Sequence, residues 1–219
     1  MLVPDPVGLI FDLDGTLIDS APDIHATANK VLGAEGLAPF DFATVCSFIG
    51  NGVGVLVSRL LQSRGLAGSG PDHTRIVAAF IRNYEEAVDL TTLYPGVSRA
   101  LDVLSAAGHP MAICTNKPAS PARAVLRHFH LAHHFPVIIG GDTLPQRKPD
   151  PAPLLAAQHA MGCANILFIG DSEVDAETAI RAGRPFLLFT EGYRKTAAEA
   201  LGAKAIFSHY DDLPALVRT

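Results

Sequence analysis

The stretch VGLIFDLDGTL at residues 7–17 decides the fold. Its apolar residues 7–11 form a short run that is typical of a buried strand, and Gly15 closes the stretch. Two carboxylates, Asp12 and Asp14, follow the run directly, where a core strand normally carries no charge. With a spacing of two they project to the same side of the chain, and they repel each other unless a cation or a shared proton relieves them. The alternative is an ordinary Asp-Gly turn.

Length and composition indicate a globular protein with a sizeable core. The 219 residues suit one large domain or a core domain with a smaller insert. Hydrophobic residues make up 48% of the chain, and the net charge is −5 with no basic run, so nucleic-acid binding is not expected. Residues 1–6 lack the features of a secretory signal, and no apolar run approaches the ~20 residues of a membrane helix. No membrane association is therefore expected.

The cysteines and clustered histidines are not expected to bind metal. Cys46, Cys114 and Cys163 are odd in number, widely spaced and set in apolar surroundings. This pattern predicts buried free thiols in a reducing compartment, and hence a cytoplasmic protein. The histidines within residues 128–134 have no compatible acid or cysteine pattern beside them, which predicts solvated side chains near a helix end.

Hydrophobic patterning divides the chain into a helical segment and an alternating segment. Residues 21–90 look helical throughout, with helices expected at 23–32, 52–61 and 73–90, a turn-rich break at 65–71 and no strand. After residue 94, apolar strands alternate with helices, which predicts an α/β fold with a parallel sheet covered on both faces. The expected strands there are 111–114, 136–139, 166–169, 186–189 and a weaker 205–207, and the expected helices are 97–107, one after Pro121, 151–161 and 174–182.

Polar side chains follow the apolar strands at the points where the strands end. Ligands of parallel sheets bind beyond the carboxyl ends of the strands, so these side chains are expected to converge. Each alone has a structural explanation, such as a helix cap, a first-turn acid or a solvated lysine. Their coincidence at strand ends favours one shared functional site. The group comprises Asp12, Thr115, Asn116, Lys117, Lys148, Asp171, Ser172 and Asp175.

The acids among them suit metal-assisted attack on phosphorus. Asp12 and Asp171 offer hard oxygen ligands of the kind that Mg²⁺ prefers. Asp12 can act as a carboxylate nucleophile and form an aspartyl phosphate. Asp14 can protonate the leaving alkoxide and then take a proton from the water that hydrolyses the intermediate.

The other polar groups suit the transferring phosphoryl group. Thr115, Asn116 and backbone amides would hold its oxygens, and Lys148 would neutralise the nucleophile and the developing charge. Uncatalysed hydrolysis of phosphate monoesters is so slow that enhancements up to ~10²¹ are known, so several converging charges are what the reaction requires. The expected partner is a small-molecule phosphate ester.

Four motifs resemble those of the haloacid dehalogenase-like (HAD) phosphohydrolase superfamily over nearly the full length. They are DLDGT at 12–16, the strand that ends in Thr115, RKPDP at 147–151 around Lys148, and GDSEVD at 170–175. The resemblance implies a Rossmann-like three-layer core with a parallel sheet, an inserted α-helical C1-type cap domain, and phosphatase activity.

The same resemblance implies roles for individual residues. Asp12 would be the nucleophile and Asp14 the general acid and base, with Lys148 as the third catalytic residue. Mg²⁺ would be held by Asp12, the backbone carbonyl of Asp14 and Asp171. Asp175 and Ser172 would support these ligands from nearby.

The domain boundaries follow from the position of the helical insert. The core is expected at residues 1–18 and 92–219, and the cap, which would close over the site and set substrate choice, at residues 19–91. Dehalogenases lack the second acid of the first motif, so Asp14 argues for phosphoryl transfer. Phosphonatases depart at the same position and use a cap lysine, whereas Lys30 is the lysine of this cap.

Within the C1 group the sequence is most similar to the bacterial phosphoglycolate phosphatases. The similarity lies in FIGNGV at 48–53, YPGV at 94–97, AICTNKP at 112–118, GGD at 140–142 and GY at 192–193. It implies 2-phosphoglycolate as the substrate, bound through Thr115, Asn116 and Lys117 and through the cap loop of Gly50, Asn51 and Gly52. That loop either presents backbone amides to the substrate carboxylate or is a tight turn that needs positive φ.

Three other functions remain open from the sequence. The chain is alternatively a phosphatase of another small sugar or nucleotide phosphate, a phosphomutase on the same scaffold, or a non-catalytic binding member. Release of inorganic phosphate in stoichiometric yield separates a phosphatase from a mutase. A monomer and a homodimer are both compatible with the sequence.

Overall fold

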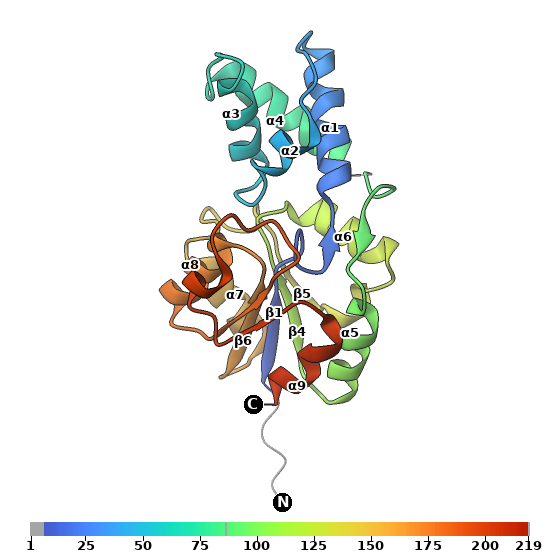
Figure 1. Cartoon of the computed structure of the whole chain (residues 1–219), viewed down its shortest axis with the longest axis vertical. Coiled ribbons are helices and arrows are strands. Elements are labelled where there is room, and N and C mark those ends of the chain that lie inside the picture. Colours follow the sequence, from blue (N-terminus) through green and yellow to red (C-terminus); the bar gives the residue numbers. More distant parts are fainter. Residues whose placement is uncertain (1–6, 86, 219) are drawn as a thin grey trace, which may run out of the picture.

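A six-stranded parallel sheet forms the centre of the computed structural model, which describes residues 7–85 and 87–218. The strand order is β5-β4-β1-β6-β7-β8, so β1 lies between β4 and β6 (Figure 1). Leu9 of β1 pairs with Met111 on one side and with Leu167 on the other. The strands are β1 (Gly8–Phe11), β4 (Met111–Cys114), β5 (Val137–Ile139), β6 (Ile166–Gly170), β7 (Phe186–Phe189) and β8 (Ala205–Phe207). This arrangement confirms the α/β fold class with a parallel sheet.

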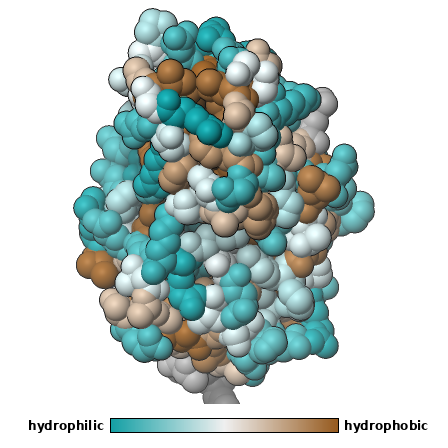
Figure 2. Space-filling model, turned by 45° about the horizontal axis from the view of Figure 1, so that its top comes forward, coloured by the Kyte–Doolittle hydropathy of each residue, from teal (hydrophilic) through white to brown (hydrophobic). Residues whose placement is uncertain are grey.

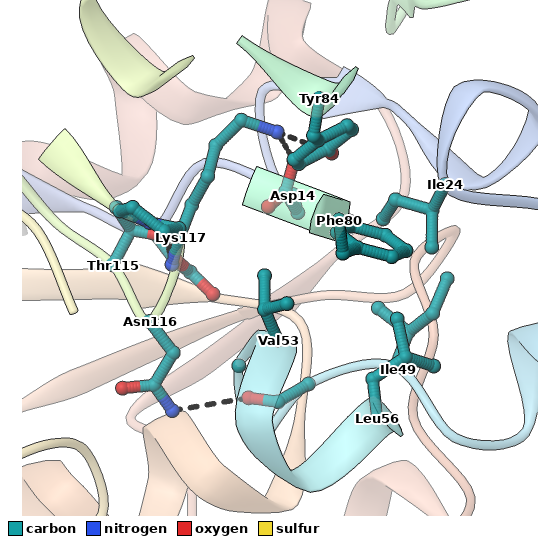
Figure 3. Close-up of a pocket in the computed structure, with 14 residues that line it drawn as sticks. Asp14, Ile24, Ile49, Val53, Leu56, Phe80, Tyr84, Thr115, Asn116 and Lys117 are labelled. Carbon is teal, nitrogen blue, oxygen red and sulfur yellow. Dashed lines mark hydrogen bonds and ion pairs between the residues drawn. The ribbon is translucent and has the colours of Figure 1, made fainter. Parts of the chain in front are cut away.

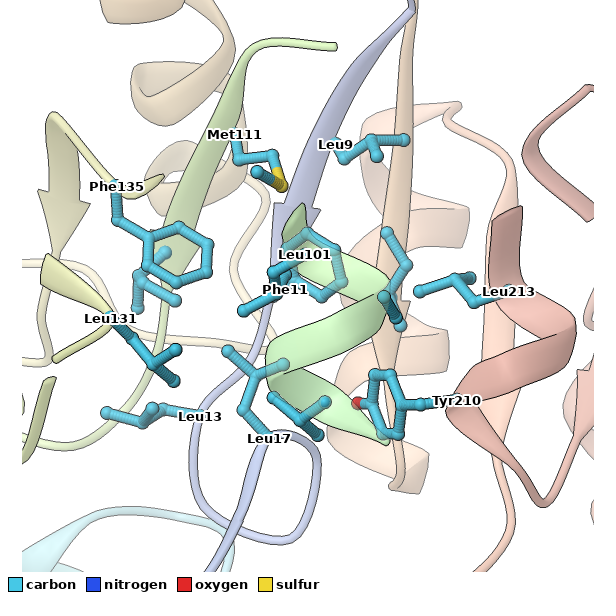
Figure 4. Close-up of a cluster of buried hydrophobic side chains, with 14 of the residues drawn as sticks. Leu9, Phe11, Leu13, Leu17, Leu101, Met111, Leu131, Phe135, Tyr210 and Leu213 are labelled. Carbon is cyan, nitrogen blue, oxygen red and sulfur yellow. The ribbon is translucent and has the colours of Figure 1, made fainter. Parts of the chain in front are cut away.

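Helices cover both faces of the sheet because successive strand residues point to opposite sides. Leu9 and Phe11 belong to an apolar cluster on one face (Figure 4), whereas Ile10 belongs to a cluster on the other face. The first face is covered by α5 (Val97–Ala106), α6 (Ala119–His128) and α9 (Leu213–Val217), and the second by α7 (Ala152–Met161) and α8 (Glu173–Ala182). Short 3₁₀ helices lie at Ala132–His134, Ala198–Leu201 and Tyr210–Asp212.

A helical unit is inserted between two very short strands. The chain leaves the core at β2 (Ile18–Asp19) and re-enters at β3 (Thr92–Leu93), and these two strands pair antiparallel. The helices between them pack around an apolar cluster of their own that includes Leu60 and Phe80. We call residues 20–91 the cap; its helices are α1 (Ala21–Ala34), α2 (Phe42–Cys46), α3 (Val53–Gln62) and α4 (Pro71–Tyr84). The domain boundaries expected from the sequence stay a prediction, and residues 1–6 lie outside the described residues.

The helices of the cap differ in detail from the expectation. The helix expected at 73–90 begins earlier, at Pro71, and ends at Tyr84. Pro71 starts it because a proline at the first helical position lacks only an N–H that has no helical partner. Helix α2 was not expected from the sequence; Asp41 begins it by accepting a hydrogen bond from the backbone N–H of Thr44 at 2.8 Å. The residue at 86 lies outside the described residues.

Figure 2 shows a mainly hydrophilic face with an apolar patch at the top, over the cap. In the described part of the chain no helix combines the length and apolar character needed to span a bilayer. All three cysteines are free thiols; Cys114 is buried, as expected, whereas Cys46 and Cys163 are half-buried.

One histidine corrects the expectation that the histidines near residue 130 are solvated. His134 is buried, and its Nε2 lies 3.2 Å from Oδ1 of Asp102, whereas the neighbouring His133 is exposed. Burial is the largest influence on His134 and lowers its pKa. This pair has no local sequence signal, because Asp102 lies on α5 and reaches His134 only through the fold.

Candidate active site

The carboxyl ends of β1, β4 and β6 form the floor of the site. Asp12 follows β1, Thr115 follows β4, and Asp171 follows β6 directly. Since the three strands are adjacent and parallel, their ends meet at one edge of the sheet. The loop after β5 brings Lys148 to the same edge. The structure therefore brings together the strand-end residues that the sequence singled out.

Lys148 lies between two carboxylates in the buried floor. Its Nζ is 3.0 Å from Oδ2 of Asp12 and 2.6 Å from Oδ1 of Asp175, and 1% of its side chain is exposed. Burial by itself lowers the pKa of Lys148, but Asp12 and Asp175 outweigh burial and raise it. Lys148 is consequently a fixed positive charge next to Asp12.

Asp12 is largely buried, and one of its carboxylate oxygens has no hydrogen-bond partner among the described residues. Burial raises the pKa of Asp12 to about 7; Lys148 opposes this rise and Asp175 adds to it. Its Oδ1 is buried and accepts no hydrogen bond from the described residues. A buried carboxylate oxygen without a partner is costly, so this atom is suited to meet a cation or a substrate atom.

Asp171 is held in place through both of its oxygens. The Thr16 hydroxyl donates to Oδ1 at 2.8 Å, and the backbone N–H of Tyr193 donates to Oδ2 at 2.6 Å. Burial raises the pKa of Asp171 well above its usual value, and Asp175 and Asp12 raise it further. Gly15 is needed beside it, since Gly15 has φ of +82° and an added Cβ would lie 2.5 Å from Asp171 Oδ2.

The three buried acids fit a divalent cation. Oxygens of Asp12, Asp171 and Asp175 lie within 4.8 Å of one another. Asp171 and Asp175 are buried, and 13% of the Asp12 side chain is exposed. Like charges at this separation repel, and Lys148 compensates for part of that charge. The unpartnered Oδ1 of Asp12 and the hard oxygen donors match the preferences of Mg²⁺ or a similar ion.

Asp175 is fully buried beneath the site, and Ser172, which lines one opening of the site, hydrogen-bonds to it. Oδ1 of Asp175 is taken by Lys148, and Oδ2 accepts from the Ser172 hydroxyl at 2.7 Å and from the backbone N–H groups of Asp171 and Ser172 at 3.2 Å. Ser172 in turn caps α8, forming a capping box with Asp175. The helix-cap explanation considered for Ser172 therefore holds, and Asp175 orients both Lys148 and the Asp171 loop.

Asp14 faces the boundary between core and cap. Its Oδ1 accepts hydrogen bonds from the Ser20 hydroxyl at 2.6 Å and from Nζ of Lys117 at 2.9 Å. Lys117 also donates to the Tyr84 hydroxyl, and its Nζ lies 4.0 Å from the centre of the Tyr84 ring. Burial and then Asp14 raise the pKa of Tyr84 well above its usual value, so the hydroxyl is neutral. Figure 3 shows Lys117 extended from the core toward both groups.

Asn116 links three loops around the site. Its Nδ2 donates to the backbone carbonyl of Gly50 at 3.1 Å and to that of Lys148 at 3.0 Å. The Thr115 hydroxyl accepts from the backbone N–H of Lys117 at 3.2 Å, so Thr115 shapes this loop and does not cap α6, whose N-cap is Pro118. Asn116 thereby fixes the cap loop against the core.

The cap loop contains the positive φ angles considered from the sequence. Gly50 has φ of +115° and Gly52 has φ of +83°, and an added Cβ on Gly52 would lie 3.1 Å from the carbonyl oxygen of Asn116. The Asn51 side chain accepts a hydrogen bond from Arg59 at 3.0 Å. The positive φ that the tight turn needs is therefore present, and Gly50, Asn51 and Gly52 each line an opening of the site.

A pocket opens between the cap and the core, directly over the acids. The core side supplies Asp12, Asp14 and the Thr115 loop, and the cap side is mainly apolar (Figure 3). A second opening near Asp171 is lined in addition by Tyr193 and Lys195. The apolar lining of the first pocket comes from Ile24, Ile49, Val53, Leu56 and Phe80.

Sequence reasoning missed the residues that support the acids from other elements. Thr16 and Ser20 lie near the first motif and carry no pattern that separates them from turn residues. Tyr84 looks like an ordinary core residue of a cap helix, and its contact with Lys117 joins residues far apart in the sequence. Tyr193 belongs to the GY dipeptide at 192–193 that resembles the phosphoglycolate phosphatases. Its hydrogen bond to Asp171, however, follows from the fold alone.

Comparisons with known proteins agree with this fold. The family profile of haloacid dehalogenase-like hydrolases matches residues 9–189. A phosphoglycolate phosphatase of Cereibacter sphaeroides is 50% identical over 96% of this chain and 97% of its own, and that of Rhodobacter capsulatus is 49% identical over 95% of each. The crystal structure of a predicted phosphoglycolate phosphatase from Haemophilus somnus superimposes with a TM-score of 0.89 at 30% identity, covering 96% of this chain and 97% of that one.

Proposed function

This chain belongs to the haloacid dehalogenase-like hydrolase family, and from that premise we propose that it is a Mg²⁺-dependent phosphatase of 2-phosphoglycolate. The main support for this substrate is the 50% identity with a phosphoglycolate phosphatase over nearly the whole of both chains. The acid cluster around Lys148 supports the reaction class, because it concentrates a nucleophile and compensating charge at one point. The partner is a small phosphate ester, and the protein is a monomer or a homodimer.

Asp12 is the nucleophile in this proposal. A carboxylate oxygen of Asp12 forms a bond to phosphorus while the bond from phosphorus to the ester oxygen breaks, which leaves an aspartyl phosphate. Lys148, 3.0 Å from Oδ2 of Asp12, favours the ionised form of the nucleophile and stabilises charge on the phosphoryl oxygens. Thr115 and Asn116 position the loop whose groups surround those oxygens.

Asp14 moves the protons. It donates a proton to the leaving alkoxide, so that glycolate departs as the neutral alcohol. It then takes a proton from the water that attacks phosphorus, and cleavage of the bond to Asp12 releases inorganic phosphate. Ser20 holds Oδ1 of Asp14 through both steps, which fixes the carboxyl group toward the pocket.

The proposed metal ligands are oxygens of Asp12, Asp14 and Asp171. A Mg²⁺ ion held by the Asp12 and Asp171 carboxylates and the Asp14 carbonyl supplies compensating positive charge when bound. Thr16 and Tyr193 orient Asp171 for this purpose. Asp175 holds Lys148, so its role is to position charge and not to touch the substrate.

The cap is proposed to close over the substrate in each turnover, because its apolar side chains form one wall of the pocket. A cytoplasmic location is proposed as well, since all three cysteines are free thiols.

Phosphate release tests the proposal. The purified protein with Mg²⁺ is expected to release one inorganic phosphate for each 2-phosphoglycolate consumed, and chelation by EDTA is expected to stop it. Asp12→Asn is expected to lower kcat by at least ~10⁴-fold, while Asp72→Asn, an exposed cap acid, serves as the matched control. Wild-type rates in Asp12→Asn would refute the nucleophile, and transfer of phosphate back to the substrate would identify a mutase instead.

A further inference from the structure

Lys117 is the positively charged member of the pocket between cap and core. Among the described residues that line this pocket, Lys117 is the one with a cationic side chain, and 4% of that side chain is exposed. Lys148, the other buried lysine near the acids, is held between Asp12 and Asp175 beneath the floor. The two lysines are therefore placed for different tasks.

The ammonium of Lys117 has two hydrogen-bond partners among the described residues. It donates to Oδ1 of Asp14 at 2.9 Å and to the Tyr84 hydroxyl, while the face of the Tyr84 ring lies 4.0 Å away. An ammonium has three N–H donors, and the described contacts use two of them. Asp14 does not depend on Lys117 for its position, because the Ser20 hydroxyl donates to the same oxygen at 2.6 Å.

Charge balance in the pocket shows what Lys117 is suited to bind. Lys148 is shared by Asp12 and Asp175, and Lys117 compensates for Asp14. A substrate that carries a carboxylate adds one more negative charge, which the apolar cap wall of Ile24, Ile49 and Phe80 cannot solvate. A charge buried without a partner is strongly unfavourable, so a carboxylate in this pocket needs a cation.

We infer that Lys117 is the receptor for the substrate carboxylate, and that it leaves Asp14 when that carboxylate binds. This inference rests on the proposed function and specifies how the site selects its substrate. Tyr84 guides the exchange, because its ring and hydroxyl keep the ammonium at the cap boundary. Once released, Oδ1 of Asp14 keeps its Ser20 contact and is open toward the ester oxygen.

The exchange links recognition to chemistry. A phosphate ester without a carboxylate leaves Lys117 on Asp14, where it blocks the oxygen that must serve the leaving group. Such an ester is expected to react slowly even when saturating, so the missing carboxylate lowers kcat as well as raising KM. Simple binding of the carboxylate elsewhere would affect KM alone.

Two other places for the carboxylate are present in the structure. Lys195 lines the second opening, near Asp171, and the cap loop of Gly50 and Gly52 lies at the rim of both openings. Lys195 is the more exposed, and its pKa is lowered by partial burial and by Arg59. It supplies a matched lysine control for the experiment.

Steady-state kinetics on two esters test the inference. The esters are 2-phosphoglycolate and 2-hydroxyethyl phosphate, which has a hydroxymethyl group in place of the carboxylate. Lys117→Met is expected to lower kcat/KM for 2-phosphoglycolate by about 100- to 1000-fold, chiefly by raising KM, because Asp14 is no longer blocked in this variant. It is expected to change kcat/KM for 2-hydroxyethyl phosphate by less than about tenfold. Lys117→Arg is expected to recover part of the preference, and Lys195→Met is expected to keep it.

The outcomes separate this inference from the proposed function. If wild-type protein does not prefer 2-phosphoglycolate, the proposed substrate fails and the inference fails with it. If the wild type does prefer it but Lys117→Met slows both esters equally, the inference alone is wrong. Loss of the preference in Lys195→Met would move the carboxylate to the second opening. Calorimetric binding of both esters to Asp12→Asn with and without Lys117→Met checks the same selectivity without turnover.

Discussion

The backbone N–H of Tyr193 donates a hydrogen bond of 2.6 Å to Oδ2 of Asp171, while the hydroxyl of the same tyrosine lies at the start of the first cap helix. That hydroxyl accepts from the backbone N–H groups of Ser20 and Ala21 at 2.8 and 2.9 Å and donates to Asp19 at 2.7 Å. One residue thus contacts both a proposed metal ligand and the junction where the chain enters the cap.

Tyr193→Phe is expected to loosen this junction without disturbing Asp171, because the backbone N–H remains. The substitution leaves the backbone N–H of Ser20 without its acceptor, which typically costs about 1–3 kcal/mol, while that of Ala21 keeps the weaker contact with Oδ1 of Asp19 at 3.3 Å. Amide hydrogen exchange of Ser20 and Ala21 is expected to accelerate, while that of β1 and β6 stays unchanged. Equal protection of these two amides in variant and wild type would contradict the role of the hydroxyl.

Lys148→Met is expected to destabilise the protein as well as inactivate it. The substitution leaves the carboxylates of Asp12 and Asp175 buried without their shared partner, for which losses of about 3–5 kcal/mol are typical. Urea unfolding in EDTA measures the loss. The control is Lys117→Met. Removal of the Lys117 ammonium leaves Asp14 with its Ser20 contact and a partly exposed side chain, so a smaller loss in the free energy of unfolding is expected.

Mg²⁺ is expected to stabilise the protein more at pH 8 than at pH 5.5. The pKa of Asp12 is raised to about 7 in the folded protein from an ordinary value of 3.8, chiefly by burial, so the folded state binds more protons than the unfolded state between these values. Stability in EDTA therefore falls as pH rises from about 4 through 7. Above that range the ionised acids bind the cation without competition from protons.

Thermal unfolding with and without Mg²⁺ at the two pH values measures this effect. Asp171→Asn is the informative variant, since it removes one proposed ligand charge and is expected to raise the Mg²⁺ concentration needed for half-maximal activity. A shift in Tm that is independent of pH and unchanged in Asp171→Asn would mean that the ion binds elsewhere.

Leu60→Ala is expected to weaken the cap alone if the cap and the core unfold as separate units. Leu60 is 1% exposed in the apolar cluster of the cap, and truncation of such a leucine typically costs about 2–5 kcal/mol. Leu101, fully buried against the sheet, is the matched core position. Hydrogen exchange is expected to rise in α1, α3 and α4 for Leu60→Ala, and throughout the sheet for Leu101→Ala.

A uniform rise across cap and sheet in both variants would show one cooperative unit. The domain boundaries expected at residues 18 and 92 would then have no thermodynamic meaning, although the two apolar clusters would remain structurally distinct.

The sheet and its functional edge could be predicted from the sequence because both leave local signals. A short apolar run followed by a charged residue, as at Asp12 and Asp171, marks the end of a buried strand. Parallel pairing then brings such ends together. The position of Asp175 could be predicted for a similar reason, since an acid in the first turn of a helix is itself a local pattern.

Other features had no local signal. Strands β2 and β3 contain two residues each, too few for any periodicity to show. The end of α4 at Tyr84 precedes residues that still look helical by composition. The contact of Lys117 with Tyr84 and that of Asp102 with His134 depend on elements that approach each other only in the folded chain.

The position of β1 in the sheet has a consequence for synthesis on the ribosome. This strand is made first, yet its partners are Met111 and its neighbours on one side and Ile166 and its neighbours on the other. The helices of the cap, whose buried apolar cluster lies within residues 21–84, are complete before either partner emerges. A newly made chain therefore carries an apolar, unpaired strand ending in Asp12 for the time that translation needs to reach β4. The central strand of the finished enzyme is thus made before the cap but becomes ordered after it.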